Sequence, residues 1–201
     1  MSNDIREALP TQLSEAKGTS LSRELFTSHF WMSGLAMLKY IPRSFHVKQV
    51  DGMAFFTEAK RDEFRNRVLR ITPGSARQWG TMSVSQMVHH LNLACGSSLG
   101  FYTLPDESYL LSRTLFRRIL VDWFPEQPVG LRLPKGFKIP HDAQFDFGFE
   151  KEQLLKIMDA AWHARSPDDW RPHCMFGKMS PEEWGKLLQI HIDYHLKQFA
   201  A

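Results

Sequence analysis

Two histidines spaced one helical turn apart, His191 and His195, constrain this chain more than any other feature. In a helix this spacing places both imidazoles on one face, near enough to share a metal ion. At about 100° per residue, the same arc also holds the apolar residues Leu188 and Ile192. A polar ring buried in an apolar stripe costs on the order of a few kcal/mol unless a partner satisfies it. The pattern therefore predicts an inward-facing histidine pair whose nitrogens need a partner.

A second predicted helix carries a third inward histidine. It begins after Ser83, because Ser83 and Gln86 have the spacing of a capping box. His89 and His90 are adjacent and point nearly opposite ways, with His90 inward. The face of His90 also holds Met87, Leu91, Ala94 and Ser98. Three inward histidines from two helices form the ligand set of an open metal site, with positions left for water or substrate.

The alternative to a metal site is a set of core histidines that hydrogen-bond to their neighbours. If a metal binds, it binds neutral imidazole, so binding should weaken as the pH falls through the range where histidine titrates. Nitrogen ligands discriminate poorly among zinc, nickel, iron and manganese, and all four stay candidates. Ile192 stands where zincin proteases carry their glutamate base, which excludes that class, and Asp193 lies on the polar face.

Two groups of motifs lie near the two ends of a region of the chain, roughly residues 55–201, that is similar to a known family. The first comprises Arg70–Pro73, Trp79–Ser83 and His90-Leu91. The second comprises Phe176–Ser180, Glu183–Gly185, His191, His195-Leu196 and Gln198-Phe199. In these motifs the chain resembles the DinB-like (YfiT-like) superfamily of helix-bundle metalloproteins, and within it a subgroup labelled only as a domain of unknown function.

The resemblance implies an all-α, four-helix bundle with an N-terminal extension and an inserted helix, and it implies a homodimer. It also implies that His90, His191 and His195 bind a divalent metal. The activity implied is metal-dependent hydrolysis of a small molecule, or thiol transfer to one, with catalytic residues not assigned. The rival interpretation is a non-catalytic binding or interaction protein whose histidines are structural.

The order of helical and irregular stretches predicts one domain over residues 21–201, preceded by a flexible polar arm over 1–20. Residues Phe45–Phe56 alternate weakly between apolar and polar and predict a small hairpin. Helices are predicted over residues 21–41, about 58–69, 83–97, 107–123 and 150–164, and from residue 180 onward.

A segment inserted between about residues 100 and 147 is expected to lie over or beside the histidines. The apolar stripe of its helix is Leu111, Leu115, Ile119 and Trp123. Its basic residues have three possible interpretations: a rim that binds an anion, a surface that attracts nucleic acid weakly, or a face exposed to solvent. They are Arg113, Arg117, Arg118, Arg132, Lys135 and Lys138.

The other histidines and the cysteines have simpler interpretations. His173 and Cys174 precede the last helix, where they either reach the mouth of the site or pack the loop. Cys95 is expected to be a buried thiol. Surface or loop positions are expected for His89, His141 and His163.

Composition indicates an ordinary globular chain, with 43% hydrophobic and 23% charged residues. A net charge of +3 is too mild to predict a nucleic-acid partner. Cys95 and Cys174 make no disulfide framework and suit a reducing cytoplasm, and the N-terminus lacks the pattern of a secretory signal. The most apolar stretch, residues 30–38, is shorter than the ~20 residues needed to span a bilayer. It predicts a buried or an interfacial helix.

Overall fold

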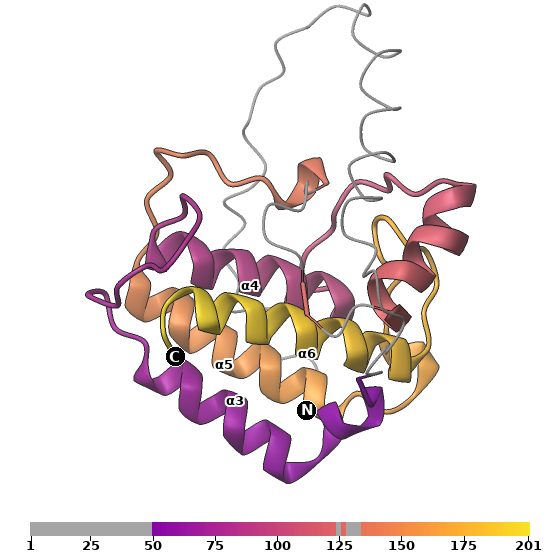
Figure 1. The fold of residues 1–201 in the computed structure, drawn as a ribbon, viewed down its shortest axis with the longest axis horizontal. Helices are drawn as coiled ribbons and strands as arrows, with labels where there is room; N and C mark the ends of the chain where they lie inside the picture. The colour runs from indigo at the N-terminus through magenta and orange to yellow at the C-terminus, as the bar shows by residue number, and fades with distance from the viewer. Residues whose placement is uncertain (1–49, 124–125, 128–133) are drawn as a thin grey trace, which may run out of the picture. The chain divides into compact units, whose positions relative to one another are not determined.

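The computed structural model describes residues 50–123, 126–127 and 134–201, all within the unit His46–Ala201. This part of the chain is mostly helical and contains no strand, which confirms the all-α class. The main helices, which lie side by side in Figure 1, are α3 (Glu58–Arg70), α4 (Val84–Leu99), α5 (Phe147–His163) and α6 (Pro181–Gln198). The short segments are η1 (Gly52–Phe56), η2 (Ser112–Phe116), η3 (Arg118–Trp123), η4 (Lys135–Phe137) and η5 (Pro167–Asp169).

Several predictions concern residues outside that description. The arm over 1–20, the helix over 21–41 and the apolar stretch over 30–38 all lie outside the described residues. Among the described helices, none combines the length and the apolar character that crossing a membrane requires. The single domain over 21–201 stays a prediction.

Side-chain caps set the start of every main helix. Ser83 with Gln86, and Ser180 with Glu183, form complete capping boxes in which each side chain accepts from the other residue's backbone N–H. The caps of the four helices, in order, are Thr57, Ser83, Asp146 and Ser180. The histidine-bearing helices α4 and α6 therefore begin where the sequence predicts.

The four helices bury a shared apolar core. Helix α4 packs against α5 and α6, α3 packs against α5 and α6, and η1 packs along α6. The fully buried side chains include Phe55, Phe64, Met87, Leu91, Leu154, Ile157, Met158, Leu188, Ile192 and Leu196. The apolar stripes predicted for α4 and α6 face this core, which brings the histidines on those stripes inward.

The predicted hairpin is wrong where the structure describes it. Residues 52–56 form the 3₁₀ helix η1, and the Asp51 side chain caps it by accepting from the backbone N–H of Met53 at 2.9 Å. Phe55 and Phe56 are both buried, so neighbouring side chains do not alternate between core and solvent. The Asp51 cap and the packing of both phenylalanines override the weak alternation.

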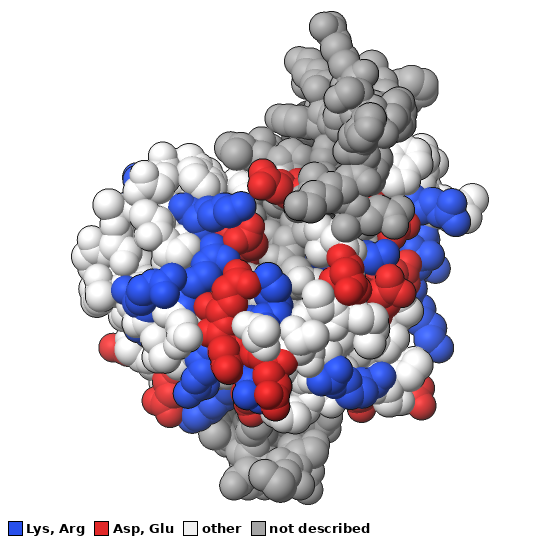
Figure 2. Space-filling model, turned by 60° about the horizontal axis from the view of Figure 1, so that its bottom comes forward, with Lys and Arg blue, Asp and Glu red and all other residues white. Residues whose placement is uncertain are grey.

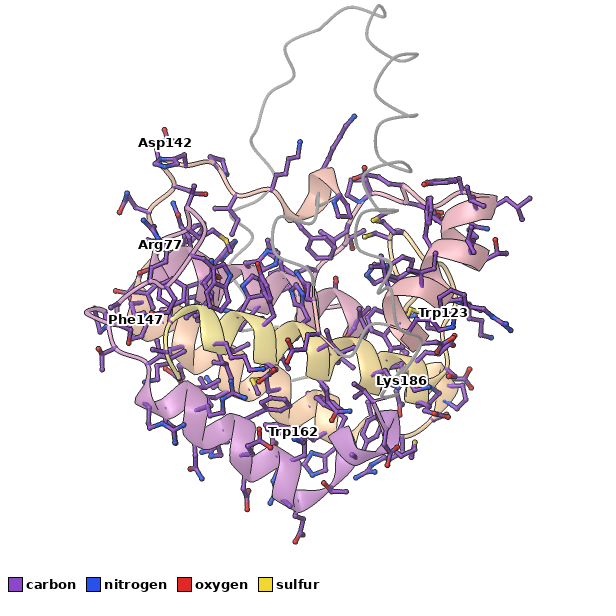
Figure 3. All side chains as sticks on the ribbon, in the orientation of Figure 1. Arg77, Trp123, Asp142, Phe147, Trp162 and Lys186 are labelled. Atoms are coloured by element: carbon purple, nitrogen blue, oxygen red, sulfur yellow. The ribbon has the colours of Figure 1, made fainter. Side chains whose placement is uncertain are left out.

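The inserted helix forms, but its predicted apolar stripe is wrong. Its η2 and η3 segments are π-helical, so its side chains do not follow the 3.6-residue period from which the stripe was predicted. Leu111, Leu115 and Trp123 are 45%, 45% and 41% exposed (Trp123 is labelled in Figure 3), whereas Ser112 and Val121 are buried.

Candidate metal centre

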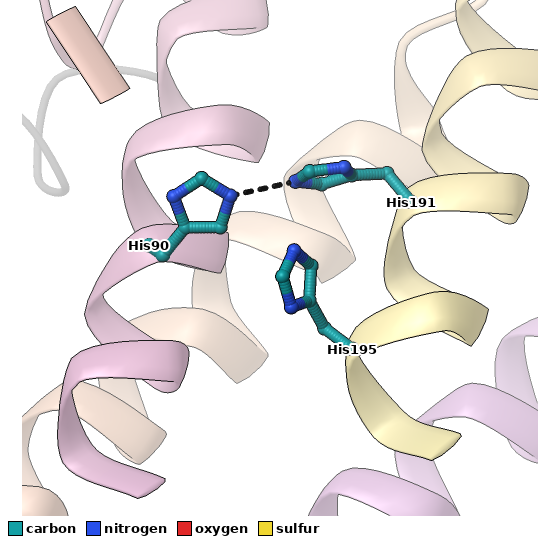
Figure 4. Close-up of side chains that lie close together, drawn as sticks. All are labelled: His90, His191 and His195. Carbon is teal, nitrogen blue, oxygen red and sulfur yellow. Dashed lines mark hydrogen bonds between the residues drawn. The ribbon is translucent and has the colours of Figure 1, made fainter. Parts of the chain in front are cut away.

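Three histidines meet between α4 and α6 (Figure 4). His90 on α4 is fully buried, His195 on α6 is 3% exposed, and His191 keeps partial exposure. One nitrogen from each ring lies within 4.8 Å of the other two, a grouping that could hold a metal ion. The Nε2 atoms of His90 and His191 are 3.1 Å apart. The structure thus brings together all three residues predicted as ligands; their ligand role stays a prediction.

Glutamine carbonyls hold the outer nitrogens of two of these rings. His191 Nδ1 lies 2.8 Å from Gln127 Oε1, and His195 Nδ1 lies 2.9 Å from Gln198 Oε1. An amide oxygen can only accept, so each neutral ring carries its proton on Nδ1. The Nε2 atom of each ring is then unprotonated and carries a lone pair. In Figure 4 the His195 ring points between the other two histidines.

This arrangement leaves buried lone pairs without a donor. Within the described part of the chain, His195 Nε2 and His90 Nδ1 make no hydrogen bond. If His90 donates from Nε2 to His191, its Nδ1 becomes a buried acceptor with no partner. If it does not, two lone pairs face each other across 3.1 Å. Either state costs free energy that a cation among the three nitrogens would remove.

The donor set fits a divalent metal. Two imidazole nitrogens on one tetrahedral zinc ion, each about 2.0–2.1 Å from it, lie roughly 3.3 Å apart. The 3.1 Å between His90 and His191 is close to that value. Neutral imidazole also suits nickel, iron and manganese, so the ligand set does not choose among them.

Burial keeps the triad of His90, His191 and His195 neutral. Desolvation, followed by repulsion from His195, lowers the pKa of His90 to about 3. Desolvation also lowers the pKa of His195 to about 4, and it holds the pKa of His191 well below its usual range. Neutral imidazole is the metal-binding form, so at neutral pH the triad needs no deprotonation before a metal binds.

The insert contributes directly to the site. It supplies Gln127, and its Phe137 packs edge-on against His90 with ring centroids 5.8 Å apart. The backbone of Phe137 acts to raise the pKa of His90, although no hydrogen bond of ordinary geometry joins the two. Since Phe137 is itself buried, it forms an apolar wall beside His90, and His191 is the triad member that keeps accessible surface.

The comparisons with known proteins give one family. A family model described as "Protein of unknown function (DUF1569)" matches residues 56–201. The chain belongs to the DUF1569 family. A search of the curated proteins and a search of the solved structures found no match. The match confirms membership of a family of unknown function, while the DinB-like relationship stays a prediction. It spans α3 to α6, so the DUF1569 region contains the whole triad.

In this DUF1569 chain, His173 and Cys174 pack the loop before α6. His173 Nδ1 accepts from the backbone N–H groups of Met175 and Phe176 at 3.0 and 3.2 Å, so it is not free to bind a metal. Desolvation lowers the pKa of His173 to about 4 and raises that of Cys174 to about 11. These contacts support the loop-packing interpretation of both residues.

The expectation that His89 lies at the surface is wrong. Its side chain is 15% exposed, and its Nδ1 lies 3.0 Å from Glu150 Oε1. Its ring stacks on Phe145 with centroids 3.8 Å apart, and Asn92 Nδ2 donates to Glu150 Oε2 at 2.6 Å. Helix α4 is covered on this side by α5, so the face opposite the triad is not solvent-facing.

The other side chains lie where the sequence predicts. Burial raises the pKa of the Cys95 thiol to about 12, and His141 and His163 are exposed. Asp193 lies away from the triad, where Arg67 Nη1 donates to its carboxylate at 2.7 Å. These residues are therefore not brought into the candidate metal centre of the DUF1569 region.

Charge pairing accounts for part of the basic insert. Arg113 lies 3.4 Å from Asp106, and Arg117 lies 3.4 Å from Glu183. Arg132 is outside the described residues. On the face shown in Figure 2, basic and acidic side chains lie next to one another. These pairs support the solvated interpretation of the insert; the anion-binding rim stays a prediction.

Proposed function

We propose that this DUF1569 protein is a DinB-like, four-helix-bundle metalloprotein that holds one divalent ion on His90, His191 and His195. The observation that carries the proposal is the buried, unpartnered Nε2 of His195, which points between the other two rings. A single unsatisfied core histidine would be a defect. Three neutral rings with converging nitrogens form a ligand set.

The proposed activity is metal-dependent hydrolysis of a small molecule or thiol transfer to one. The ion would supply Lewis-acid chemistry, since a divalent metal lowers the pKa of a water ligand toward neutrality and deprotonates a thiol ligand. The chain keeps the imidazoles neutral by burial and holds two of their protons on Nδ1 through Gln127 and Gln198. Cys95 and Cys174 are buried with raised pKa values, so the thiol in a transfer reaction would come from the substrate side.

The second candidate is a non-catalytic protein in which the metal is structural. The near-complete burial of His90 and His195 favours this candidate, because a structural site has a closed shell. The partial exposure of His191 favours the catalytic one, because a substrate must reach the ion.

Metal analysis by mass spectrometry on untagged protein tests the site. The wild type should hold about one metal per chain, and His90→Ala and His195→Ala should each lose it. His173→Ala is the matched control, since that imidazole also has a lowered pKa but is held by two backbone N–H groups. Metal retained in both triad variants, or no uptake by the wild type after reconstitution, would overturn the proposal.

A further inference from the structure

Gln198 connects the triad to a distant turn. It lies three residues after His195 and is 3% exposed. Its Oε1 accepts from His195 Nδ1 at 2.9 Å, while its Nε2 donates to the Trp79 carbonyl at 2.8 Å. The Trp79 carbonyl can only accept, so a flipped amide would place two oxygens against each other at this end.

The turn that carries Trp79 is shaped around this glutamine. The backbone N–H of Gln78 donates to the Gln198 carbonyl at 2.8 Å, which fixes the main chain beside the side chain. Gly80 has a φ of 81°, and a Cβ there would lie 2.5 Å from Gln198 Nε2. Glycine is therefore required at this turn by its backbone conformation and by the space that the amide occupies.

We infer that Gln198 is a positioning residue that keeps the His195 proton on Nδ1 and aims the Nε2 lone pair at His90 and His191. The turn at Trp79 and Gly80 holds Gln198 in place for this role. Without the amide oxygen, the ring is free to carry its proton on Nε2, and that tautomer cannot ligate a metal through Nε2. The effect on metal binding rests on the proposed function, whereas the effect on the tautomer does not.

Three variants isolate this role. Gln198→Leu removes the acceptor. Gln189→Leu is the matched control, because Gln189 is a buried glutamine of the same helix whose Nε2 donates to the carbonyls of Asp51 and Gly185 at 2.8 and 3.2 Å. Gly80→Ala changes none of the three histidines or the two glutamines, but its methyl group displaces the Gln198 amide from the Trp79 carbonyl. It keeps the test decisive if Gln198→Leu does not fold.

Two measurements are made on each variant. Long-range ¹H–¹⁵N spectra of the metal-free protein at neutral pH report which nitrogen of His195 is protonated. We expect Nδ1–H in the wild type and Gln189→Leu, and a loss of this single tautomer in Gln198→Leu and Gly80→Ala. Titration with Co²⁺, followed by visible absorption, should show binding weakened by about 10–100-fold in the latter two variants only.

The outcomes separate the two proposals. If Gln198→Leu matches Gln189→Leu in tautomer and in Co²⁺ affinity, the positioning role is overturned while the metal site stands. If the wild type takes up no Co²⁺ but only Gln198→Leu and Gly80→Ala lose the Nδ1–H signal, the metal proposal fails and the positioning role is supported.

Discussion

At the residue scale, buried imidazoles make the protein sensitive to acid. His90, His173, His191 and His195 all have lowered pKa values, each mainly because burial disfavours the charged ring. In the unfolded chain the same rings would titrate near 6.5. At any pH between the lowered pKa values of the folded state and the unfolded value near 6.5, the unfolded state therefore binds more protons than the folded state.

We predict that the metal-free protein loses stability as the pH falls from about 6.5 toward 4. The pKa of His90 is about 3 and that of His173 and His195 about 4, so these rings stay neutral until the protein unfolds. Each histidine lowers the free energy of unfolding by up to about 1.4 kcal/mol per pH unit within that window, and none contributes a slope above about pH 7. Urea unfolding at a series of pH values measures this slope.

One variant controls the pH experiment. His173→Ala should have a shallower slope than the wild type, because one imidazole with a lowered pKa is gone. A wild-type stability that does not change between about pH 7 and 5 would contradict the assignment of lowered pKa values to these four rings.

The pair of His89 and Glu150 gives a second prediction at this scale. Both carboxylate oxygens of Glu150 accept, one from His89 and one from Asn92. Glu150→Leu removes both acceptors, which leaves one N–H of the buried Asn92 amide unpaired and should cost about 1–3 kcal/mol. Glu152→Leu, at an exposed position of the same helix, should change the free energy of unfolding by less than about 0.5 kcal/mol. Equal effects of the two changes would contradict the contacts described for Glu150.

At the scale of elements, η1 and α6 approach one another through backbone contact. A Cβ on Gly52 would collide with the Glu182 carbonyl oxygen, and a Cβ on Gly185 would collide with the Gly52 carbonyl oxygen. Phe55 and Phe56 follow directly in η1 and are buried in the core. The two glycines thus let η1 lie close enough to α6 for both rings to reach the core.

Gly185→Ala should therefore destabilise the protein. The added methyl meets backbone rather than a flexible side chain, so η1 has to move, at a cost of about 1–3 kcal/mol or more. Gly148→Ala is the matched control, because Gly148 lies in the first turn of α5. A Cβ added there would lie 3.4 Å from Asp146 Oδ1, which is an ordinary van der Waals contact. There alanine should be neutral or stabilise by up to about 1 kcal/mol. Thermal unfolding compares them, and equal melting temperatures would contradict the close approach.

At the scale of the whole molecule, metal binding and folding should be coupled but separable. The described core is largely apolar and extends well beyond the triad, through Leu154, Ile157 and Met158 of α5. The helices therefore have packing that does not depend on an ion.

We predict that a divalent metal raises the melting temperature and that a chelator reverses the rise without unfolding the protein. At a free metal concentration about 100 times Kd the stabilisation is about 2.7 kcal/mol. For a chain of this size, that corresponds to a shift of about 5–11 °C. His195→Ala should show no shift. Loss of the helical circular dichroism signal on chelation would instead favour the structural-metal candidate.

Local signals in the sequence determined the helices and the inward direction of the three histidines. The capping boxes at Ser83 and Ser180 depend on residues three apart, and the faces of α4 and α6 follow from the 3.6-residue period. Both depend only on near neighbours in the chain. For this reason the inward direction of each histidine could be predicted from its own helix, whereas the meeting of His90 with His191 and His195 was implied by the resemblance to the DinB-like superfamily.

Only the tertiary structure decided what surrounds those rings. Gln198 is near His195 in sequence, but its amide is oriented by Trp79, which is 119 residues away. Likewise α5 and Phe145 cover His89, and η1 packs along α6. A helical period states which residues share a face but not which faces have a neighbour, and that depends on contacts between distant parts of the chain.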